Sequence, residues 1–376
     1  MNREYYVIQG STTFFKENLP ILINESRISI FSELIKESDD CKVRGTKFQN
    51  HADFLLIKND NYNGITEQAH DRLGPLIEDI TNSDAEIYIH NPPSNVLDYL
   101  KEKEKNDEIV LSIKKQKYDL DRDEQNFVHR MEEISSSIIG QNKAIIEVSK
   151  SMWYLTNVKR EKPYVVMFYG NSSLGKTQLV REIADKFYSN QFFEKHLSMF
   201  KNDSYSDYFF GNKPNRASLG YELLARTSNL IFLDELDKCP EYFFSAFYTL
   251  FDNKIFRDST YEVNTAGTLI ILTSNYLSEA EMKSKLGLPI FYRIDKFIEF
   301  NDFDTETIYQ VVLKEIKDRE DEYGHLLNLD DIYSEVSKQI NVTGENARTI
   351  KYKIQKVIED LLFSKINEEF HGKINK

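Results

Sequence analysis

The strongest chemical signal in the sequence is an eight-residue run from Gly170 to Thr177. It reads Gly-Asn-Ser-Ser-Leu-Gly-Lys-Thr and fits the spacing G-x-x-x-x-G-K-[ST] at every fixed position. An apolar segment at 164–169 precedes it and a helical pattern at 178–187 follows, which is the context this spacing requires. Glycines let backbone amides close around phosphate oxygens, and a helix N-terminus adds partial positive charge. The run therefore predicts a loop that binds the phosphates of a nucleotide.

The positions of this loop have different expected roles. We expect Lys176 to reach the β- and γ-phosphates of ATP, and the Thr177 hydroxyl to bind Mg²⁺. The other residues expected to contact the nucleotide are Gly170, Asn171, Ser172, Ser173, Leu174, Gly175 and Gln178. The alternative is a chance glycine turn before a helix, and the combination of strand, loop and helix argues against it.

A second signal is a pair of carboxylates after a short apolar run at 230–233. Asp234 and Glu235 follow this run directly, as expected where a buried strand delivers acids to a phosphate site. We expect Asp234 to hold Mg²⁺ through its water ligands and Glu235 to polarise the attacking water. An apolar run that ends in two acids is by itself only a strand end, so this prediction depends on the phosphate loop. The neighbouring Asp237 and Lys238 are interpreted as structural.

The elements that position these residues are predicted to alternate between strand and helix. A helical pattern at 134–153 precedes the strand at 164–169, and apolar runs recur at 197–200, 230–233, 269–272 and 297–300. Such alternation implies a mostly parallel sheet with helices on both faces. Beyond Asp304 the pattern is helical to the end. Its apolar faces are Ile308, Val311, Val312, Leu313 and Ile316, then Ile350, Ile354, Val357, Ile358, Leu361 and Leu362. We predict an α/β nucleotide-binding core at 126–302 and a helical lid at 303–376.

The N-terminal third is predicted to form a small separate α/β domain at 1–125. Strand-like runs occur at 5–8, 54–57, 87–89 and 109–113, separated by stretches rich in Asn, Asp and Gly. Ser94 is expected to cap a helix through Leu100, and the charged run at 101–105 to be a solvated helix end or turn. The segment 114–130 is dense in charge and is our candidate linker.

Four further segments occur in a characteristic order around these motifs. Ile139-Gly140-Gln141 precedes the first core helix, Thr273-Ser274-Asn275 ends a strand, and Phe291–Asp295 and Gly344–Arg348 follow. Together with the phosphate loop and the acidic pair, they make residues 138–348 resemble the AAA+ ATPases of the Clp/heat-shock unfoldase clade. The resemblance implies a P-loop core with a parallel five-stranded sheet and a C-terminal helical lid.

The resemblance also implies roles for four more residues. Ile139 would cradle adenine, and Asn275, as the first sensor, would position the water or contact the γ-phosphate. Arg293 would be an arginine finger that serves the nucleotide of a neighbouring subunit, and Arg348 would report on nucleotide from the lid. Taken singly, Asn275 could be a turn residue, Arg348 a helix-surface arginine, and Arg293 a residue that stacks on aromatic rings. A finger that acts in trans implies a ring homo-oligomer, usually a hexamer in this family.

Two departures from the family bear on function. Unfoldases of this clade grip a threaded polypeptide with an aromatic residue on a loop between the second and third core strands, where this chain has Arg216 or Ser218. Tyr221 or the pair Phe209 and Phe210 could substitute, although aromatic residues in a packed helix are more often core. Members that feed a peptidase carry an apolar docking loop between the first sensor and the finger. Here 276–286 reads as a short polar helix, so no peptidase complex is predicted.

The composition restricts the partners and the compartment. The 376 residues carry 48 basic and 61 acidic side chains, and the net charge of −13 weighs against nonspecific binding to nucleic acid. The two cysteines lie far apart, which fits a reducing cytoplasm, and the apolar runs are too short to cross a membrane. The start of the sequence does not resemble a signal peptide. The seven histidines show no metal-ligand spacing.

Three functions were weighed on this basis. The first is an ATP-driven remodeller that disassembles a protein partner chosen by the N-terminal domain. The alternative is a nucleotide-gated oligomeric switch, for example in a bacterial defence system, without threading. A DNA-directed motor is disfavoured by the acidic charge and by the absence of a recognisable DNA-binding motif.

Overall fold

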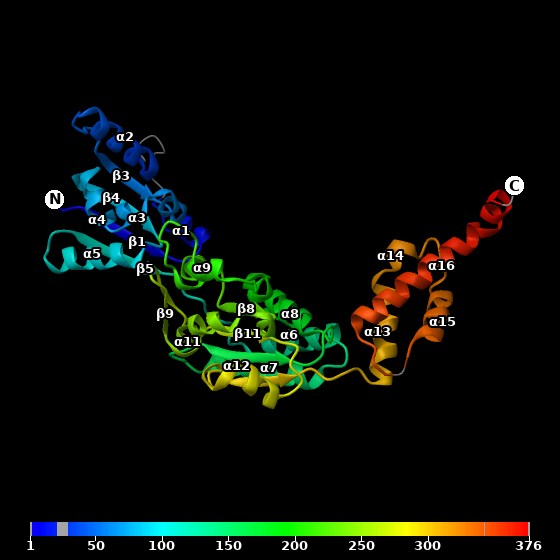
Figure 1. Ribbon diagram of the computed structural model, residues 1–376. Helices are drawn as coiled ribbons and strands as arrows, with labels where there is room; N and C mark the ends of the chain where they lie inside the picture. Colours follow the sequence, from blue (N-terminus) through cyan, green and yellow to red (C-terminus); the bar gives the residue numbers. More distant parts are fainter. Residues whose placement is uncertain (1, 21–28, 342, 375–376) are drawn as a thin grey trace.

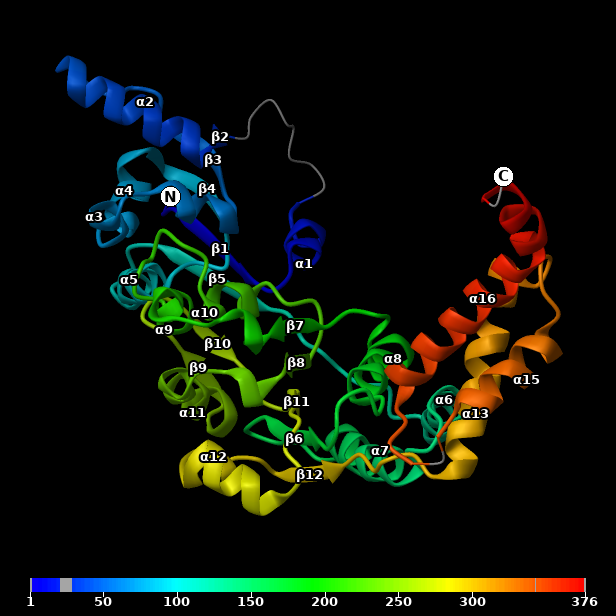
Figure 2. The same ribbon diagram turned by 45° about the vertical axis from the view of Figure 1, so that its right-hand side comes forward.

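Three parts follow one another along the chain in the computed structural model, which describes residues 2–20, 29–341 and 343–374 (Figure 1). The N-terminal domain (2–115) and the core (124–300) each contain a five-stranded parallel sheet, and the helical part (305–374) contains none among its described residues. Figures 1 and 2 both show the N-terminal domain and the helical part on opposite sides of the core. The predicted α/β fold with a parallel five-stranded core sheet is confirmed.

The N-terminal domain is a parallel sheet in the order β2-β3-β4-β1-β5 with helices between the strands. Its elements are β1 (Glu4–Gln9), α1 (Thr12–Glu17), β2 (Ser29–Ile30), α2 (Phe31–Arg44), β3 (Ala52–Ile57), α3 (Glu67–His70), α4 (Leu73–Asp79), β4 (Thr81–His90), α5 (Ser94–Lys105) and β5 (Val110–Lys115). The predicted strands at 5–8, 54–57 and 87–89 lie within β1, β3 and β4, and the one at 109–113 overlaps β5, which begins one residue later.

The expectation that Ser94 caps its helix is wrong. Pro93 occupies the cap position of α5, and Ser94 is the first helical residue. The Ser94 backbone N–H donates instead to the Thr260 carbonyl of the core, at 2.8 Å. The helix continues to Lys105, so the charged run at 101–105 is its last turn. The predicted linker is also shorter than expected, because β5 reaches Lys115 and α6 begins at Glu124.

The core sheet has the order β12-β6-β11-β8-β7, with every neighbouring pair parallel. Its strands are β6 (Tyr164–Tyr169), β7 (Phe193–His196), β8 (Leu230–Asp234), β11 (Leu269–Thr273) and β12 (Lys296–Glu299), and a hairpin is formed by β9 (Ile255–Arg257) and β10 (Glu262–Asn264). Its helices are α6 (Glu124–Ser137), α7 (Asn142–Asn157), α8 (Lys176–Tyr188), α9 (Ser206–Phe210), α10 (Leu219–Leu224), α11 (Phe244–Asp252) and α12 (Glu279–Phe291).

Both faces of the core sheet are buried, which explains its nearly continuous apolar strands. Along β6, Val165 and Met167 pack on one side with α10, α11 and α12, whereas Val166 and Phe168 pack on the other with α6, α7 and α8. The second strand differs from the prediction. It ends at His196, and 197–199 is a 3-10 turn that places Leu197 and Phe200 in the first of these clusters.

The helical pattern at 134–153 is interrupted in the structure. Residues 138–141 separate α6 from α7, and Gly140 has a φ of +79°. A Cβ at Gly140 would lie 2.3 Å from Cγ2 of Thr307, so glycine allows the close approach of the helical part at this turn.

The two sheets share one strand order. Numbered by their order within each sheet, the strands lie as second, third, fourth, first, fifth in both the N-terminal domain and the core. The structure therefore contains the same parallel winding twice, and the phosphate loop follows the first strand of the second sheet only.

The helical part packs around its own small apolar cluster. It comprises α13 (Thr305–Asp318), α14 (Glu320–Tyr323), α15 (Leu329–Gln339) and α16 (Ala347–Ile374). Ile308, Val312 and Ile354 are fully buried there, whereas Leu313, which was expected on the apolar face, is 52% exposed. Ile139 and Phe303 pack against this cluster from outside. Within the described part of the chain, no helix has the length and apolarity to span a bilayer.

Candidate functional site

The predicted phosphate loop lies at the carboxyl edge of the core sheet, between β6 and α8. Gly170 has a φ of +127°, and a Cβ there would meet the Phe300 carbonyl oxygen at 2.4 Å. Gly175 has a φ of +95° at the start of α8. Both positions therefore favour glycine strongly, which is the structural reason for the spacing seen in the sequence.

Lys176 is held inside this loop by its own backbone. Its ammonium group donates to the Gly170 carbonyl at 2.6 Å, to the Asn171 carbonyl at 2.7 Å and to Oδ1 of Asn275 at 3.3 Å. Burial lowers the pKa of Lys176 to about 8, although Asp237 and Asp234 oppose that shift. A bound phosphate would supply the missing charge partner at this position.

Asp234 and Glu235 end β8 beside the loop, and Thr273 connects them. The Thr273 hydroxyl donates to Oδ1 of Asp234 and accepts from the Glu235 backbone N–H at 3.0 Å. Nδ1 of His196 lies 3.1 Å from Oδ2 of Asp234. Glu235 has a φ of +59°, a left-handed conformation that is uncommon for a residue with a side chain. Such outliers concentrate at functional sites.

Asn275 lies at the end of β11 and is held by Asp237. The Asn275 backbone N–H donates to Oδ1 of Asp237 at 3.2 Å, and its amide nitrogen donates to Oδ2 at 3.4 Å. The Asp237 side chain is only 6% exposed. We had interpreted Asp237 as structural, and the structure gives it a specific place, because it orients the side chain of Asn275.

These side chains meet around one cavity of about 520 Å³. Its lining includes the loop, the acidic pair, the first sensor and the start of α16; the residues are Ser172, Ser173, Gly175, Lys176, Thr177, Gln178, Asp234, Glu235, Thr273, Ser274, Asn275, Ala347 and Arg348. The Ala347 backbone N–H donates to the Ser173 carbonyl at 3.2 Å, which brings Arg348 to the phosphate side of the cavity.

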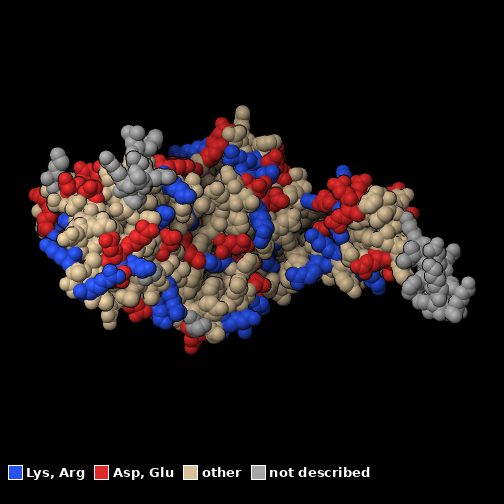
Figure 3. All heavy atoms as spheres, turned by 90° about the horizontal axis from the view of Figure 1, so that it is seen from above, with Lys and Arg blue, Asp and Glu red and all other residues tan. Residues whose placement is uncertain are grey.

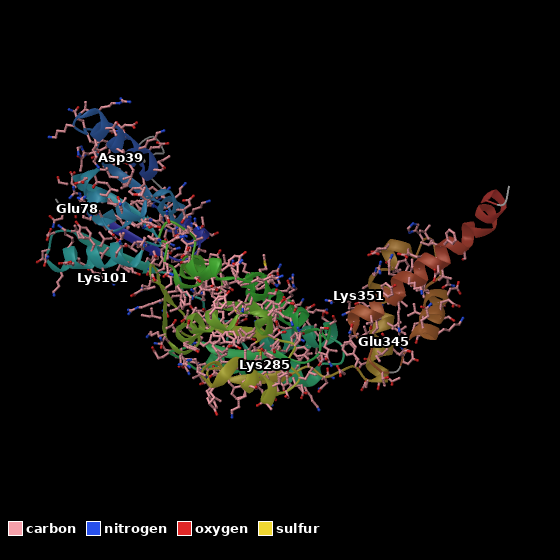
Figure 4. The ribbon with its side chains drawn as sticks, viewed as in Figure 1. Asp39, Glu78, Lys101, Lys285, Glu345 and Lys351 are labelled. Atoms are coloured by element: carbon pink, nitrogen blue, oxygen red, sulfur yellow. The ribbon has the colours of Figure 1, made fainter. Side chains whose placement is uncertain are left out.

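A second hollow of about 610 Å³ adjoins the first and shares Gly175, Gln178 and Ala347 with it. Its apolar wall is formed by Ile139, Leu174, Phe303 and Val311. Such a wall suits the flat purine base of a nucleotide. Lys314 and Lys351 of the helical part also line it, and Figure 4 shows Lys351 on the side of the helical part that faces the core. The molecule narrows at this junction in the space-filling view of Figure 3.

Arg293 lies away from this cavity. Its Nε is 3.2 Å from Oδ2 of Asp252, its Nη1 donates to the Pro289 carbonyl at 2.6 Å, and its guanidinium lies 4.8 Å from the ring centroid of Tyr248. A residue in this position cannot serve the phosphates of its own chain without a large movement. Its predicted role toward a neighbouring subunit remains a prediction.

The donor set fits Mg²⁺ when phosphates are present. Thr177 and Asp234 line the same cavity as Lys176, and the Asp234 side chain is 11% exposed. Mg²⁺ commonly binds one or two protein oxygens, substrate phosphates and several waters. Elsewhere in the described residues, no group of three or more His, Cys, Asp or Glu side chains forms a metal site.

Three residues of this site were not predicted. The sequence assigns no role to Thr273 within the Thr-Ser-Asn triplet, it indicates only a structural role for Asp237, and it shows no metal-ligand spacing around His196. The triplet could have pointed to Thr273, because a hydroxyl at a strand end can bridge neighbouring strands. The sequence carries no signal for His196, which reaches Asp234 only through the pairing of β7 with β8.

The segment at the predicted threading loop is packed at its two ends and more exposed in its middle. Ser218 is 1% exposed, caps α10 and donates to Asp258 at 2.6 Å, while Arg216 is exposed. Phe209 belongs to the core cluster, and the partly buried Tyr221 packs against it. The region expected to hold a short polar helix contains α12, which is kinked at Gly287.

Comparison with known proteins agrees with this geometry. The family model described as AAA domain (Cdc48 subfamily) matches residues 161–375, more than half of the chain. The chain therefore belongs to this family, and its core is a Clp-like AAA+ ATPase.

Curated relatives point to the same clade. The chain is 24% identical to the chaperone protein ClpB of Mycoplasma genitalium, over 68% of this chain and 39% of that protein. It is 26% identical to ClpB of Chlamydia caviae, over 61% and 31%. It is 24% identical to the ATP-dependent Clp protease ATP-binding subunit ClpE of Bacillus subtilis, over 64% and 40%. The chain thus spans well under half the length of these relatives.

Proposed function

We propose that the chain hydrolyses ATP at the subunit interfaces of a ring homo-oligomer, with a hexamer as the expected size, and uses this energy to remodel a protein partner. The observation that carries the proposal is the single cavity in which Lys176, Glu235, Asn275 and Arg348 meet. The names of the ClpB relatives, which are chaperones, support the remodelling role.

Each side chain has a part in this proposal. Lys176 leaves the loop carbonyls to bind the β- and γ-phosphates, and Ile139 packs against the base. Thr177 and Asp234 would hold Mg²⁺, which neutralises phosphate charge and orients the phosphoryl group. Glu235 orients the attacking water and acts as the general base that accepts a proton from it. Arg348 contacts the phosphates from the helical part.

Arg293 of one subunit completes the site of the next. Such fingers accelerate hydrolysis by about 10³–10⁵. In the single chain its guanidinium pairs with Asp252, so binding to a neighbour's phosphate must replace that pair.

The partner is proposed to bind the N-terminal domain, and the compartment is proposed to be the cytoplasm. Both cysteines, Cys41 and Cys239, are free, as expected in a reducing environment. A nucleotide-gated switch without threading is the second candidate. The observation that favours it lies at the two positions where a threading aromatic was expected: Ser218 is buried against Asp258, and the exposed residue is Arg216, which is not aromatic.

Two variants test the ATPase proposal. Lys176→Ala should reduce ATP turnover to background and abolish ATP-dependent assembly, because the phosphates lose their cation. Glu235→Gln should stop turnover but keep ATP-dependent assembly, because only water activation is lost. Turnover is followed by phosphate release, and assembly by light scattering after chromatography. Normal turnover in Lys176→Ala would refute the assignment of the loop.

A mixing experiment tests the shared site. Arg293→Ala and Lys176→Ala chains should each be inactive, and their mixture should regain part of the activity, because one supplies the finger and the other an intact loop. Light scattering first establishes that the two chains assemble together with ATP; if no ratio restores turnover in such mixed assemblies, the trans role of Arg293 is wrong.

Remodelling and switching can then be separated. A remodeller should unfold a tagged model substrate when ATP is supplied, whereas a switch should assemble with ATP and leave the substrate folded. A pull-down with Glu235→Gln would identify the partner that the ring holds.

A further inference from the structure

A cavity of about 390 Å³ lies between the N-terminal domain and the core, separate from the ATP site. On one side it is lined by the carboxyl ends of β1 and β5, including Gln9, Gly10 and Lys115, and by Leu97 and Lys101 of α5. Figure 4 labels Lys101 on α5, at the lower edge of the N-terminal domain. The other side is formed by residues before β8 and by the β9–β10 hairpin. Parallel α/β sheets commonly bind ligands at this end of their strands.

The wall of this cavity is strongly basic in a chain that is acidic overall. Its charged residues are Lys101, Lys115, Lys117, Arg226 and Lys254, together with the carboxylate of Glu262. Glu262 is already paired with Arg257 at 2.7 Å. Lys101 pairs with Asp98 and Lys254 with Glu161, but Lys115 and Lys117 form no ion pair within the described residues.

Arg226 is a buried cation whose partners are neutral. It is 8% exposed and donates to the carbonyls of Leu223 at 2.8 Å and Asn264 at 2.7 Å. Its guanidinium lies 4.8 Å from the ring centroid of Tyr118, and its Nε has no hydrogen-bond partner among the described residues. Burial lowers the pKa of Arg226, and no described carboxylate lies within ion-pair distance to compensate. Burying a charge without a counter-charge is costly, so an anion in the adjoining cavity would stabilise this arrangement.

The uncharged part of the wall combines the amides of Gln9, Gln116, Asn229 and Asn264 with an apolar patch. Leu97, Leu224 and Val263 are buried and line the same cavity, beside the ring of Tyr118. A ligand that fits must therefore combine a negative group with a body that can lie against apolar side chains. The volume is in the range of small-molecule sites, which begins at about 300 Å³.

We propose that this cavity binds a small organic phosphate, such as a nucleoside monophosphate. Its phosphate lies between Lys115 and Lys117 in the field of Arg226, and its ring lies against Leu224 and Val263. Because the ligand touches both walls, it holds the N-terminal domain to the core. The proposal does not depend on the ATPase function.

The test uses the full chain with Lys176→Ala, so that the phosphate loop is disabled. AMP and inorganic pyrophosphate are titrated separately by calorimetry without magnesium, and thermal unfolding is measured with each. We expect AMP to bind one site per chain and to raise the unfolding temperature. Adding Lys115→Glu and Lys117→Glu should weaken AMP binding by about tenfold or more.

The matched control adds Lys105→Glu and Lys114→Glu instead. These lysines are also exposed and give the same net charge, but they lie outside the cavity wall, so AMP affinity should not change. Circular dichroism checks that both variants are folded. Tighter binding of AMP than of pyrophosphate supports the apolar wall. Binding of pyrophosphate alone overturns the assignment to an organic phosphate, and loss of binding to the same extent in both variants, or no binding at all, overturns the site.

Discussion

At the scale of the residue, the nucleotide site depends on side chains that orient the reacting groups through hydrogen bonds. Lys176 and Glu235 do the proposed chemistry, but Thr273 ties Asp234 to Glu235, and Asp237 orients Asn275. Hydrogen-bonded partners of this kind fix the geometry on which hydrolysis depends.

Asp237 gives a direct test of this arrangement. Asp237→Ala should lower kcat for ATP by about 10- to 100-fold with little change in KM, by analogy with other supporting partners of a reactive group. Asn275 would lose both of its hydrogen bonds to this carboxylate while the phosphate loop stays intact. Steady-state ATPase assays measure the effect, and Glu279→Ala, an exposed acid on α12, is the control.

The contact between Asp237 and Asn275 also predicts how the losses of kcat in the two variants combine. Asp237→Ala combined with Asn275→Ala should be no slower than Asn275→Ala alone, because the first change acts through the second residue. Fully additive losses would show that Asp237 has an independent role.

Site residues could be predicted from the sequence where they are neighbours along the chain. The phosphate loop was found from the sequence because its glycines, lysine and threonine are consecutive and their roles follow from backbone geometry. The partnership of Asp237 with Asn275 was not found, because the two residues are 38 positions apart and meet only when β8 and β11 pair.

At the scale of the element, the N-terminal domain contains two buried histidines, one at the end of a strand and one at the end of a helix. His90 closes β4, where Nε2 lies 2.8 Å from the Gly10 carbonyl oxygen and the ring stacks on Phe15. His70 closes α3, with Nε2 2.8 Å from the Tyr62 carbonyl oxygen. Burial lowers the pKa of both imidazoles, so the folded domain keeps them neutral.

This burial predicts acid sensitivity. Below about pH 6.5 the unfolded chain binds protons that the folded chain does not, so stability falls as the pH is lowered. The double variant His70→Gln/His90→Gln should lose less stability than the wild type between pH 7.5 and pH 5. Thermal unfolding at both pH values measures this, with exposed His129→Gln as the control that should behave like the wild type. An unchanged pH response in the double variant would contradict the assignment.

Elements with strong periodic patterns were predictable, and weakly patterned ones were not. Four of the core strands were found because their apolar runs are nearly continuous, whereas β7, whose four residues are only half-buried, was expected four residues later in the sequence. The two-residue strand β2 and the six-residue helix α1 were missed because they are too short to show a period. The charge-rich α2 buries only Phe31, Leu34 and Ser38, so its apolar face is narrow.

At the scale of the whole molecule, the nucleotide site closes only where the core meets the helical part. The contacts there are few: the Lys314 ammonium donates to the Ser137 carbonyl, Ala347 binds Ser173, and Ile139 packs on the helical cluster. Lys314, Arg319 and Lys351 face the hollow from the helical side together with Glu315 and Asp318, so an anionic nucleotide there would add a contact between the core and these cations.

Nucleotide should therefore stiffen this junction. Hydrogen exchange at 137–141 and 347–351 is expected to slow when ADP and magnesium are added. The reason is that the helical part then contacts both the core and the bound nucleotide. The measurement is exchange mass spectrometry, and Lys176→Ala should show much smaller protection. Equal protection in that variant would mean that the nucleotide does not act through the loop.

The repeated strand order makes the two sheets comparable position by position. In the N-terminal sheet the backbone amide of Gly10, just after the first strand, is already taken by Oδ1 of Asn91 at 2.8 Å, and that of Ser11 by Oε1 of Gln116 at 2.7 Å. Because these two backbone N–H groups already donate to side chains of the domain, they cannot also donate to the oxygens of a triphosphate. The chain thus carries two sheets of the same winding, and of the two first-strand loops only the one in the core is expected to bind a triphosphate, which agrees with the smaller phosphate proposed at the edge of the N-terminal sheet.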